Sequence, residues 1–199
     1  MNDREKVDKT RRTLVAATSV VGGAAAVGAA IPFIASMNPS ARARAAGAPV
    51  EAEIATMQPG ELRVFEWRGK PVWVIRRSNE MIESLKAVVP NLTDPQSKAS
   101  EQPQYAENEF RSIKPEIMVM EGVCTHLGCS PQLKPAEAKG EMGADWVGGF
   151  YCPCHGSKFD FAGRVFRGAP APTNLPVPPY TFVSDGQLLI GEDKEKKGA

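Results

Sequence analysis

Two short segments hold every cysteine and histidine of this chain. The first, residues 124–129, reads Cys-Thr-His-Leu-Gly-Cys, and the second, residues 152–157, reads Cys-Pro-Cys-His-Gly-Ser. The 199 residues contain four cysteines and two histidines, and all six lie in these two hexapeptides. Cysteine and histidine are soft ligands, and a single metal centre usually takes four of them. The spacing therefore predicts a site that is built from two separate loops.

Three kinds of site could use these side chains. A structural zinc ion would take two cysteines with two histidines, or all four cysteines, and would leave the remaining residues without a role. Two disulfides would use the cysteines and leave both histidines idle. A [2Fe–2S] cluster with two histidines on one iron would use four residues as ligands, and the spare cysteines could link the loops. The spacing favours the cluster because every residue then has a role, but it leaves zinc and plain disulfides open.

The two segments together resemble the cluster-binding boxes of the Rieske iron–sulfur proteins of quinol–cytochrome c oxidoreductases, the cytochrome bc1 complexes. The match is specific because it fixes ligand type, order and spacing in two places. The resemblance implies that Cys124 and Cys152 bind the inner iron of one [2Fe–2S] cluster. It implies equally that His126 and His155 bind the outer, more exposed iron and act as the catalytic residues, with His155 in direct contact with the quinol.

The resemblance extends to residues that do not bind iron. It implies a disulfide between Cys129 and Cys154, a hydrogen bond from the Ser157 hydroxyl to a cluster sulfide, and an apolar cover from Leu127. The proline-containing residues 168–172 would form a third loop over the cluster. The cluster-binding subdomain is then expected at about residues 122–172.

The ligand set also predicts the kind of redox reaction. Two neutral imidazoles in place of two thiolates remove negative charge, so the addition of an electron costs less. Such centres have potentials of about −150 to +300 mV, against about −400 mV for plant-type ferredoxins. This range suits the oxidation of a quinol.

One residue departs from the respiratory members that the chain resembles. Phe159 stands two residues after Ser157, where those members commonly carry a tyrosine. The resemblance implies that the tyrosine hydroxyl donates a hydrogen bond to a ligand sulfur, here that of Cys124. Phenylalanine keeps the ring but lacks the donor, so we expect a lower cluster potential than in the tyrosine-bearing members.

The N-terminal region predicts a membrane anchor. Residues 1–12 contain five Lys/Arg and three Asp/Glu, and residues 13–37 form a run of 25 residues without charge. At 1.5 Å per residue such a helix spans about 37 Å, enough to cross a bilayer core of roughly 30 Å. Residues 10–14, Thr-Arg-Arg-Thr-Leu, are typical of a twin-arginine export signal. Residues 41–43 offer a small-x-small cleavage site, but the run exceeds the 7–15 apolar residues of a signal peptide, so we favour an uncleaved anchor.

The charge flanks predict the orientation of that anchor. Five Lys/Arg precede the apolar run, whereas only Arg42 and Arg44 follow it closely, so the N-terminus is expected in the cytoplasm. The domain at residues 50–199 would then lie in the periplasm, on a single-pass anchor in the inner membrane. The oxidising periplasm would allow a disulfide to persist. Residues 38–49 are small and polar and are predicted to be a linker. Composition is compatible with a passive tether, and the resemblance implies a flexible hinge.

The elements that must position the two loops are predicted to be short strands. The 17 prolines and 18 glycines indicate a loop-rich β architecture. We expect an all-β Rieske fold: stacked antiparallel sheets, a small cluster-binding subdomain and one helical insertion. The helix follows Ser78 and carries apolar residues as far as Val89, and the polar residues 91–112 are predicted to be a surface excursion. Alternating and apolar patterns predict strands at residues 61–67, 71–75, 116–120, 145–151, 164–166, 180–183 and 187–190.

The resemblance, together with the anchor and the ligand set, implies one function. The chain is expected to be the electron-transfer subunit of a respiratory quinol–cytochrome c reductase, taking one electron from ubiquinol with proton release and passing it to cytochrome c1. Its partners would be the cytochrome b and cytochrome c1 subunits of a dimeric complex that supports proton translocation. The alternative is a Rieske subunit of a periplasmic molybdenum oxidase. A net charge of +1 gives no support for nucleic-acid binding.

Overall fold

The structure is a computed structural model that describes residues 9–41, 45 and 47–193. The chain divides into two compact units, residues 1–45 and residues 46–199. Residues 1–8, 42–44, 46 and 194–199 lie outside the described part. They belong to the predicted N-terminal segment, the predicted hinge and the end of the C-terminal domain.

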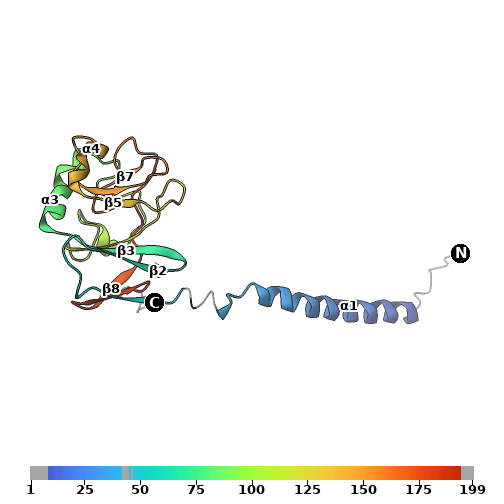
Figure 1. The fold of residues 1–199 in the computed structure, drawn as a ribbon. Coiled ribbons are helices and arrows are strands. Elements are labelled where there is room, and N and C mark those ends of the chain that lie inside the picture. Colours follow the sequence, from blue (N-terminus) through green and yellow to red (C-terminus); the bar gives the residue numbers. More distant parts are fainter. Residues whose placement is uncertain (1–8, 42–44, 46, 194–199) are drawn as a thin grey trace. The chain divides into compact units, whose positions relative to one another are not determined.

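The first unit contains one long helix, α1, at Lys9–Ser36. It has 28 residues and contains almost all of the uncharged run (Figure 1). None of its side chains is buried. The hydroxyls of Thr13 and Thr18 donate to carbonyls one turn earlier, so these polar groups are satisfied within the helix. By length and composition α1 can cross a membrane, as the sequence predicted.

Within the described part of the second unit, the strands form three antiparallel sheets of three strands each. Their orders are β1-β9-β8, β2-β3-β4 and β5-β6-β7, and Figure 1 shows them one above another, with β2 and β3 in the middle layer. The predicted all-β Rieske architecture is confirmed. The strands are β1 Val50–Glu53, β2 Leu62–Trp67, β3 Lys70–Arg76, β4 Ile117–Glu121, β5 Gln132–Lys134, β6 Gly149–Tyr151, β7 Lys158–Phe159, β8 Tyr180–Ser184 and β9 Gln187–Ile190.

The middle sheet begins as a hairpin and ends at the first loop. Strands β2 and β3 are joined through Arg68 and Gly69, whose φ angles of 53° and 73° suit the tight turns that match strand twist. All five residues of β4 are buried; the first four are apolar, as in a core strand, and the last, Glu121, pairs with Lys70 at 2.7 Å. It ends three residues before Cys124 and therefore fixes where the first loop begins.

The predicted helical insertion is α3, at Asn79–Ala87. The Ser78 hydroxyl accepts a hydrogen bond from the Met81 N–H, as an N-cap should. The helix ends two residues before Val89, which begins a 3₁₀ turn instead, because a residue before proline is disfavoured in the α conformation. The other short helices are η1 Val89–Asn91, η2 Gln104–Ala106, η3 Ala136–Ala138 and α4 Lys139–Met142.

Two strand predictions were wrong in part or in whole. Residues 164–166 form no regular strand: Val165 and Phe166 make isolated β-bridges with Phe159 and Leu92. They follow a tight turn that Gly163 closes with φ of 70°, in which the Asp160 N–H donates to the Arg164 carbonyl. The predicted strand at 145–151 is confined to β6, because Trp146 turns inward and donates its indole N–H to the Pro135 carbonyl.

The prediction of a surface excursion at residues 91–112 was wrong in part, because the segment is largely exposed or half-buried but sends several side chains into the interior. Leu92, Ala106 and Arg111 are completely buried, and Ser97 and Ser112 are nearly so. This polar segment instead packs against the elements that lead to the two loops.

Candidate metal centre

The two cysteine- and histidine-containing segments fold into loops that are closed in the same way. In the first loop, residues 124–129, the Cys124 N–H donates to the Cys129 carbonyl at 2.7 Å, and the Gly128 N–H donates to the Cys124 carbonyl at 3.0 Å. In the second loop, residues 152–157, the same two bonds measure 2.8 and 2.9 Å, the latter from Gly156. Both glycines have φ above 80°, a conformation that favours glycine. The sequence did not predict this equivalence, although the shared spacing Cys-x-x-x-Gly is its signal.

The strands hold the two loops at their ends. β4 leads into the first loop, whereas β6 and β7 pair on either side of the second, with Tyr151 opposite Lys158. Trp73 of β3 packs against both supports. Its indole lies where a Cβ on Gly122 would be, 2.2 Å away, and its ring stacks on Phe150 of β6 at 5.1 Å. Gly122 must therefore remain a glycine for the first loop to approach the sheet.

A disulfide joins the loops through Cys129 and Cys154. The predicted pairing is confirmed, and it spans 25 residues of sequence. The sulfurs of Cys129, Cys152 and Cys154 lie within 4.8 Å of one another, which resembles a metal-binding group. The disulfide excludes that group as a ligand set, because two of its three sulfurs are bonded to each other. A four-cysteine zinc site is excluded for the same reason.

The remaining two cysteines are free and buried. Cys124 is 2% exposed and Cys152 is 1% exposed, and the two thiols are close enough to hydrogen bond. Burial raises the pKa of the Cys152 thiol and Cys124 raises it further, whereas the backbone N–H groups of Cys154 and His155 oppose the shift. Two thiolates would not stay together here without a cation to compensate their charge.

The two histidines lie next to each other. Their rings are perpendicular, with centroids 4.7 Å apart, so His126 and His155 face one region from different loops. His126 is half-buried, and its Nδ1 is a buried atom without a hydrogen-bond partner among the described residues. A buried polar atom of this kind calls for a partner outside the protein, and a metal ion supplies one. His155 is exposed.

The donor set therefore fits an iron–sulfur cluster with mixed ligands. Two buried thiols and two adjacent imidazoles remain after the disulfide is formed, which is the set of a Rieske-type [2Fe–2S] cluster. The same four donors would also suit a single tetrahedral zinc ion. Donor chemistry alone does not distinguish a [2Fe–2S] cluster from a zinc ion. Similarity to known proteins distinguishes them.

A third loop contacts both others, as the resemblance led us to expect for residues 168–172. The Ser157 hydroxyl oxygen accepts a hydrogen bond from the Ala171 N–H at 3.0 Å, and the Thr125 hydroxyl donates to the Thr173 carbonyl at 2.7 Å. Ser157 is completely buried, and its own hydroxyl proton is left for another acceptor. Leu127 is 70% exposed, so it presents an apolar surface at the tip of the first loop.

Sequence reasoning missed a group of buried charges near these loops. Arg77, Arg111 and Arg164 are at most 2% exposed, and Asp160 is 1% exposed. Arg164 donates to the Asp160 carboxylate at 2.7 Å. The spacing of Asp160 and Arg164, four residues apart just after the second loop, was the available signal.

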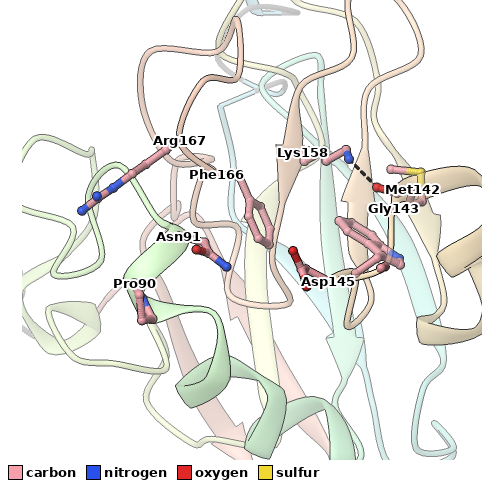
Figure 2. Close-up of a pocket in the computed structure, with 10 residues that line it drawn as sticks. Pro90, Asn91, Met142, Gly143, Asp145, Lys158, Phe166 and Arg167 are labelled. Carbon is pink, nitrogen blue, oxygen red and sulfur yellow. Dashed lines mark hydrogen bonds between the residues drawn. The ribbon is translucent and has the colours of Figure 1, made fainter.

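A cavity of about 440 Å³ lies beside the second loop but is separate from the cysteines and histidines. Figure 2 shows Lys158 at its edge, donating to the Met142 carbonyl at 2.6 Å, with the Phe166 ring pointing inward. None of its lining residues is a cysteine or histidine. This cavity therefore contains none of the predicted ligand residues.

Comparison with known proteins separates the two possible cofactors. The family model of the Rieske [2Fe–2S] domain matches residues 93–179, and a model described as the ubiquinol–cytochrome c reductase Fe–S subunit TAT signal matches residues 1–40. The ubiquinol–cytochrome c reductase iron–sulfur subunit of Allochromatium vinosum is 58% identical over 184 residues, which are 92% of this chain and 89% of that protein. The subunit of the same name from Blastochloris viridis is 43% identical over 194 residues, covering 96% and 98%.

More distant relatives carry related names. The mitochondrial Rieske subunit of the cytochrome b–c1 complex of Bos taurus is 39% identical over 180 residues, which are 89% of this chain and 58% of that protein. A chain of the solved hyperthermophilic respiratory Complex III is 26% identical, with a TM-score of 0.47, and covers 87% of this chain and 98% of that one. On the identity and coverage of the bacterial relatives, the chain belongs to the family of Rieske iron–sulfur subunits of ubiquinol–cytochrome c reductase.

Proposed function

We propose that Cys124, Cys152, His126 and His155 hold the [2Fe–2S] cluster of this electron-transfer subunit. The observation that carries the assignment is the pairing of two buried free thiols with two adjacent imidazoles, one of which has an unpartnered buried Nδ1. When bound, the cluster supplies a centre that takes up and releases one electron at a time. Cys129 and Cys154 link the loops, and Ser157 directs its hydroxyl proton to a cluster sulfide.

The exposure of the four side chains supports a division of roles. The buried thiols of Cys124 and Cys152 lie on the protein side and hold the inner iron. The imidazoles lie nearer the surface and would hold the outer iron, on the side that faces solvent. His155, which is exposed, meets ubiquinol, and its ring nitrogen that does not bind iron accepts the proton of the quinol hydroxyl. Leu127 covers the outer side and excludes water during the transfer.

The partners and the location follow from the same assignment. The chain takes its electron from ubiquinol held by a cytochrome b subunit and delivers it to a cytochrome c1 subunit in a dimeric complex. Helix α1 anchors it in the inner membrane with the N-terminus in the cytoplasm and the cluster domain in the periplasm, and residues 38–49 act as the hinge between those two electron-transfer positions. The relatives are named as reductase subunits, which favours this function over a molybdenum oxidase.

The test is the composition and activity of the complex that contains the full chain. Purification from membranes should yield iron and acid-labile sulfide in equal amounts, with b- and c-type haem, and should support oxidation of ubiquinol. His155→Ala should lose iron, sulfide and quinol oxidation, whereas Val64→Ala, at an exposed position on β2, should keep all three. Zinc without sulfide would contradict the cluster, and molybdenum in place of haem would contradict the reductase.

The residue at position 159 gives a quantitative prediction. Phe159 is completely buried in the same core as Cys124. We expect Phe159→Tyr to raise the midpoint potential, because a hydroxyl that donates to the ligand sulfur stabilises the more negative, reduced state. A difference of about 1 kcal/mol corresponds to roughly 40 mV for one electron. Redox titration of the purified complex measures the shift.

A matched control lies two residues further along the chain. Phe161 is also buried, but its ring packs against Gly148 and Phe150. Phe161→Tyr adds the same hydroxyl and should leave the midpoint potential of the cluster unchanged. An unchanged or lower midpoint in Phe159→Tyr would show that this position does not correspond to the tyrosine of other members.

A further inference from the structure

The side chain of Arg111 is held in the interior at a cost. It is completely buried; its Nε donates to Gln102 Oε1 at 2.9 Å, and its Nη1 donates to the Ala162 carbonyl at 3.0 Å. Its Nη2 is buried and has no hydrogen-bond partner among the described residues. An unsatisfied buried donor, and above all a charged one, destabilises a fold. A residue that maintains this arrangement is therefore a candidate for a role other than stability.

Arg111 lies where the supports of all three loops meet. A Cβ placed on Gly163 would be 3.0 Å from Met120 Sδ, 3.2 Å from Leu175 Cβ and 3.3 Å from Arg111 Nη1. Met120 belongs to β4, which leads to the first loop. Gly163 follows the second loop by six residues. Arg111 thus lies against the turn that follows the second loop, at a point that Met120 of β4 also approaches.

The third loop reaches the same junction through the backbone. The Leu175 N–H donates to the Gly163 carbonyl at 2.8 Å, just after Thr173, whose carbonyl accepts from the first loop. A guanidinium placed here interacts with the whole loop assembly rather than with one loop.

The charges in this network do not balance. Three buried guanidinium groups, those of Arg77, Arg111 and Arg164, share one buried carboxylate, that of Asp160. That carboxylate is paired directly with Arg164 at 2.7 Å. Outside the interior, the half-buried carboxylate of Asp94 acts on Arg111, and the exposed carboxylate of Glu116 acts on Arg77. The network therefore keeps a net positive charge in the interior.

Arg111 remains charged under ordinary conditions. Burial lowers the pKa of its guanidinium to about 10, and the negative charge of Asp160 opposes that shift. A pKa near 10 still leaves the group protonated at neutral pH. Its field is also poorly screened by salt, because buried charges are shielded much less than exposed ones.

We infer that Arg111 is a positioning residue for electron transfer: it joins the supports of the three loops, and its charge raises the reduction potential of the cluster that they hold. Reduction adds one negative charge to the site, so a fixed positive charge in the adjacent interior stabilises the reduced state. The inference rests on the proposed function, since it requires the cluster between the first two loops. It adds a residue of the 91–112 segment to the redox machinery.

The experiment compares two substitutions of Arg111 in the full chain within its membrane complex. Arg111→Gln keeps hydrogen-bonding groups but removes the charge, and should shift the midpoint to lower potential. Arg111→Lys keeps the charge but loses the planar fork, and should stay close to the wild-type midpoint. Iron and sulfide content and the thermal unfolding temperature are measured alongside, and both variants are expected to lower the unfolding temperature. If Arg111 had a purely structural role, both variants would have a lower unfolding temperature, but the midpoint potential would not depend on whether the charge is kept.

A substitution of opposite sign completes the test. Asp160→Asn removes the buried negative charge and should raise the midpoint. The inference is overturned if Arg111→Gln holds its cluster at the wild-type midpoint, or if Arg111→Lys falls as far as Arg111→Gln. If Arg111→Gln retains no cluster, an unchanged or lower midpoint in Asp160→Asn overturns it. Failure of the proposed function looks different, because the wild-type complex itself would then lack iron and sulfide.

Discussion

Serine in place of Cys129 or Cys154 should leave a chain that has all four ligand side chains but loses its cluster readily and oxidises little quinol. Each loop closes on its own backbone hydrogen bonds, so either substitution preserves the loops themselves. What it removes is the covalent link between them. Closing a loop of 25 residues by a disulfide stabilises the folded state by about 3.5 kcal/mol in the chain-entropy model. Without that link, the two ligand pairs are kept together by noncovalent contacts alone, among them the hydrogen bonds of Thr125 and Ser157 to the third loop and the packing of Trp73.

The measurement is the iron and sulfide content of the purified complex, followed over time at a fixed temperature. The double variant should behave like either single variant, because both substitutions break the same bond and their effects cannot add. Ser130→Ala, at an exposed neighbour of Cys129, is the matched control and should keep the cluster. A single variant that held iron and sulfide as long as the wild type would show that the disulfide does not stabilise the site.

The loops could be predicted from sequence because their chemistry is local. A cysteine or histidine ligand has no substitute, and two six-residue segments contain all of them together with the glycines that close each loop. The position of the helix after Ser78 followed from an equally local signal, whereas the pairing of Cys129 with Cys154 came from the family resemblance and not from spacing. Short strands were found where their apolar pattern was regular, as in β2, β3, β4 and β9.

The buried arginines could not be predicted because their reason for burial is not local. Segments without regular strands leave backbone carbonyls that lack partners, and such groups must be satisfied when they are buried. Arg77 donates to the carbonyls of Pro115 and Phe110, and Arg164 donates to those of Leu85 and Pro95. These acceptors are distant in sequence from their donors. The polar, proline-containing residues 91–112 were therefore predicted to lie on the surface, although several of their polar groups form hydrogen bonds in the interior.

Lysine in place of both Arg11 and Arg12 should keep the whole chain on the cytoplasmic side and abolish assembly of an active complex. The two arginines lie in the first turn of α1, within the region that matches the family's TAT signal. A cluster held partly by buried thiols has to be inserted where iron and sulfide are supplied, so the domain must be exported already folded. A lysine pair keeps the charge and the helix, and changes only the guanidinium groups that the twin-arginine motif specifies.

The disulfide provides a sensitive readout of where the chain resides. Thiols stay reduced in the cytoplasm and form disulfides in the periplasm. In the Arg11→Lys, Arg12→Lys variant, alkylation of cluster-free protein should therefore label all four cysteines, including Cys129 and Cys154. In the wild type, where those two form the disulfide, it should label only Cys124 and Cys152. Arg4→Lys, outside the pair, is the control and should match the wild type. Periplasmic accumulation of the double variant with an intact disulfide would exclude the twin-arginine route, and the folded domain would then have to acquire its cluster after crossing the membrane.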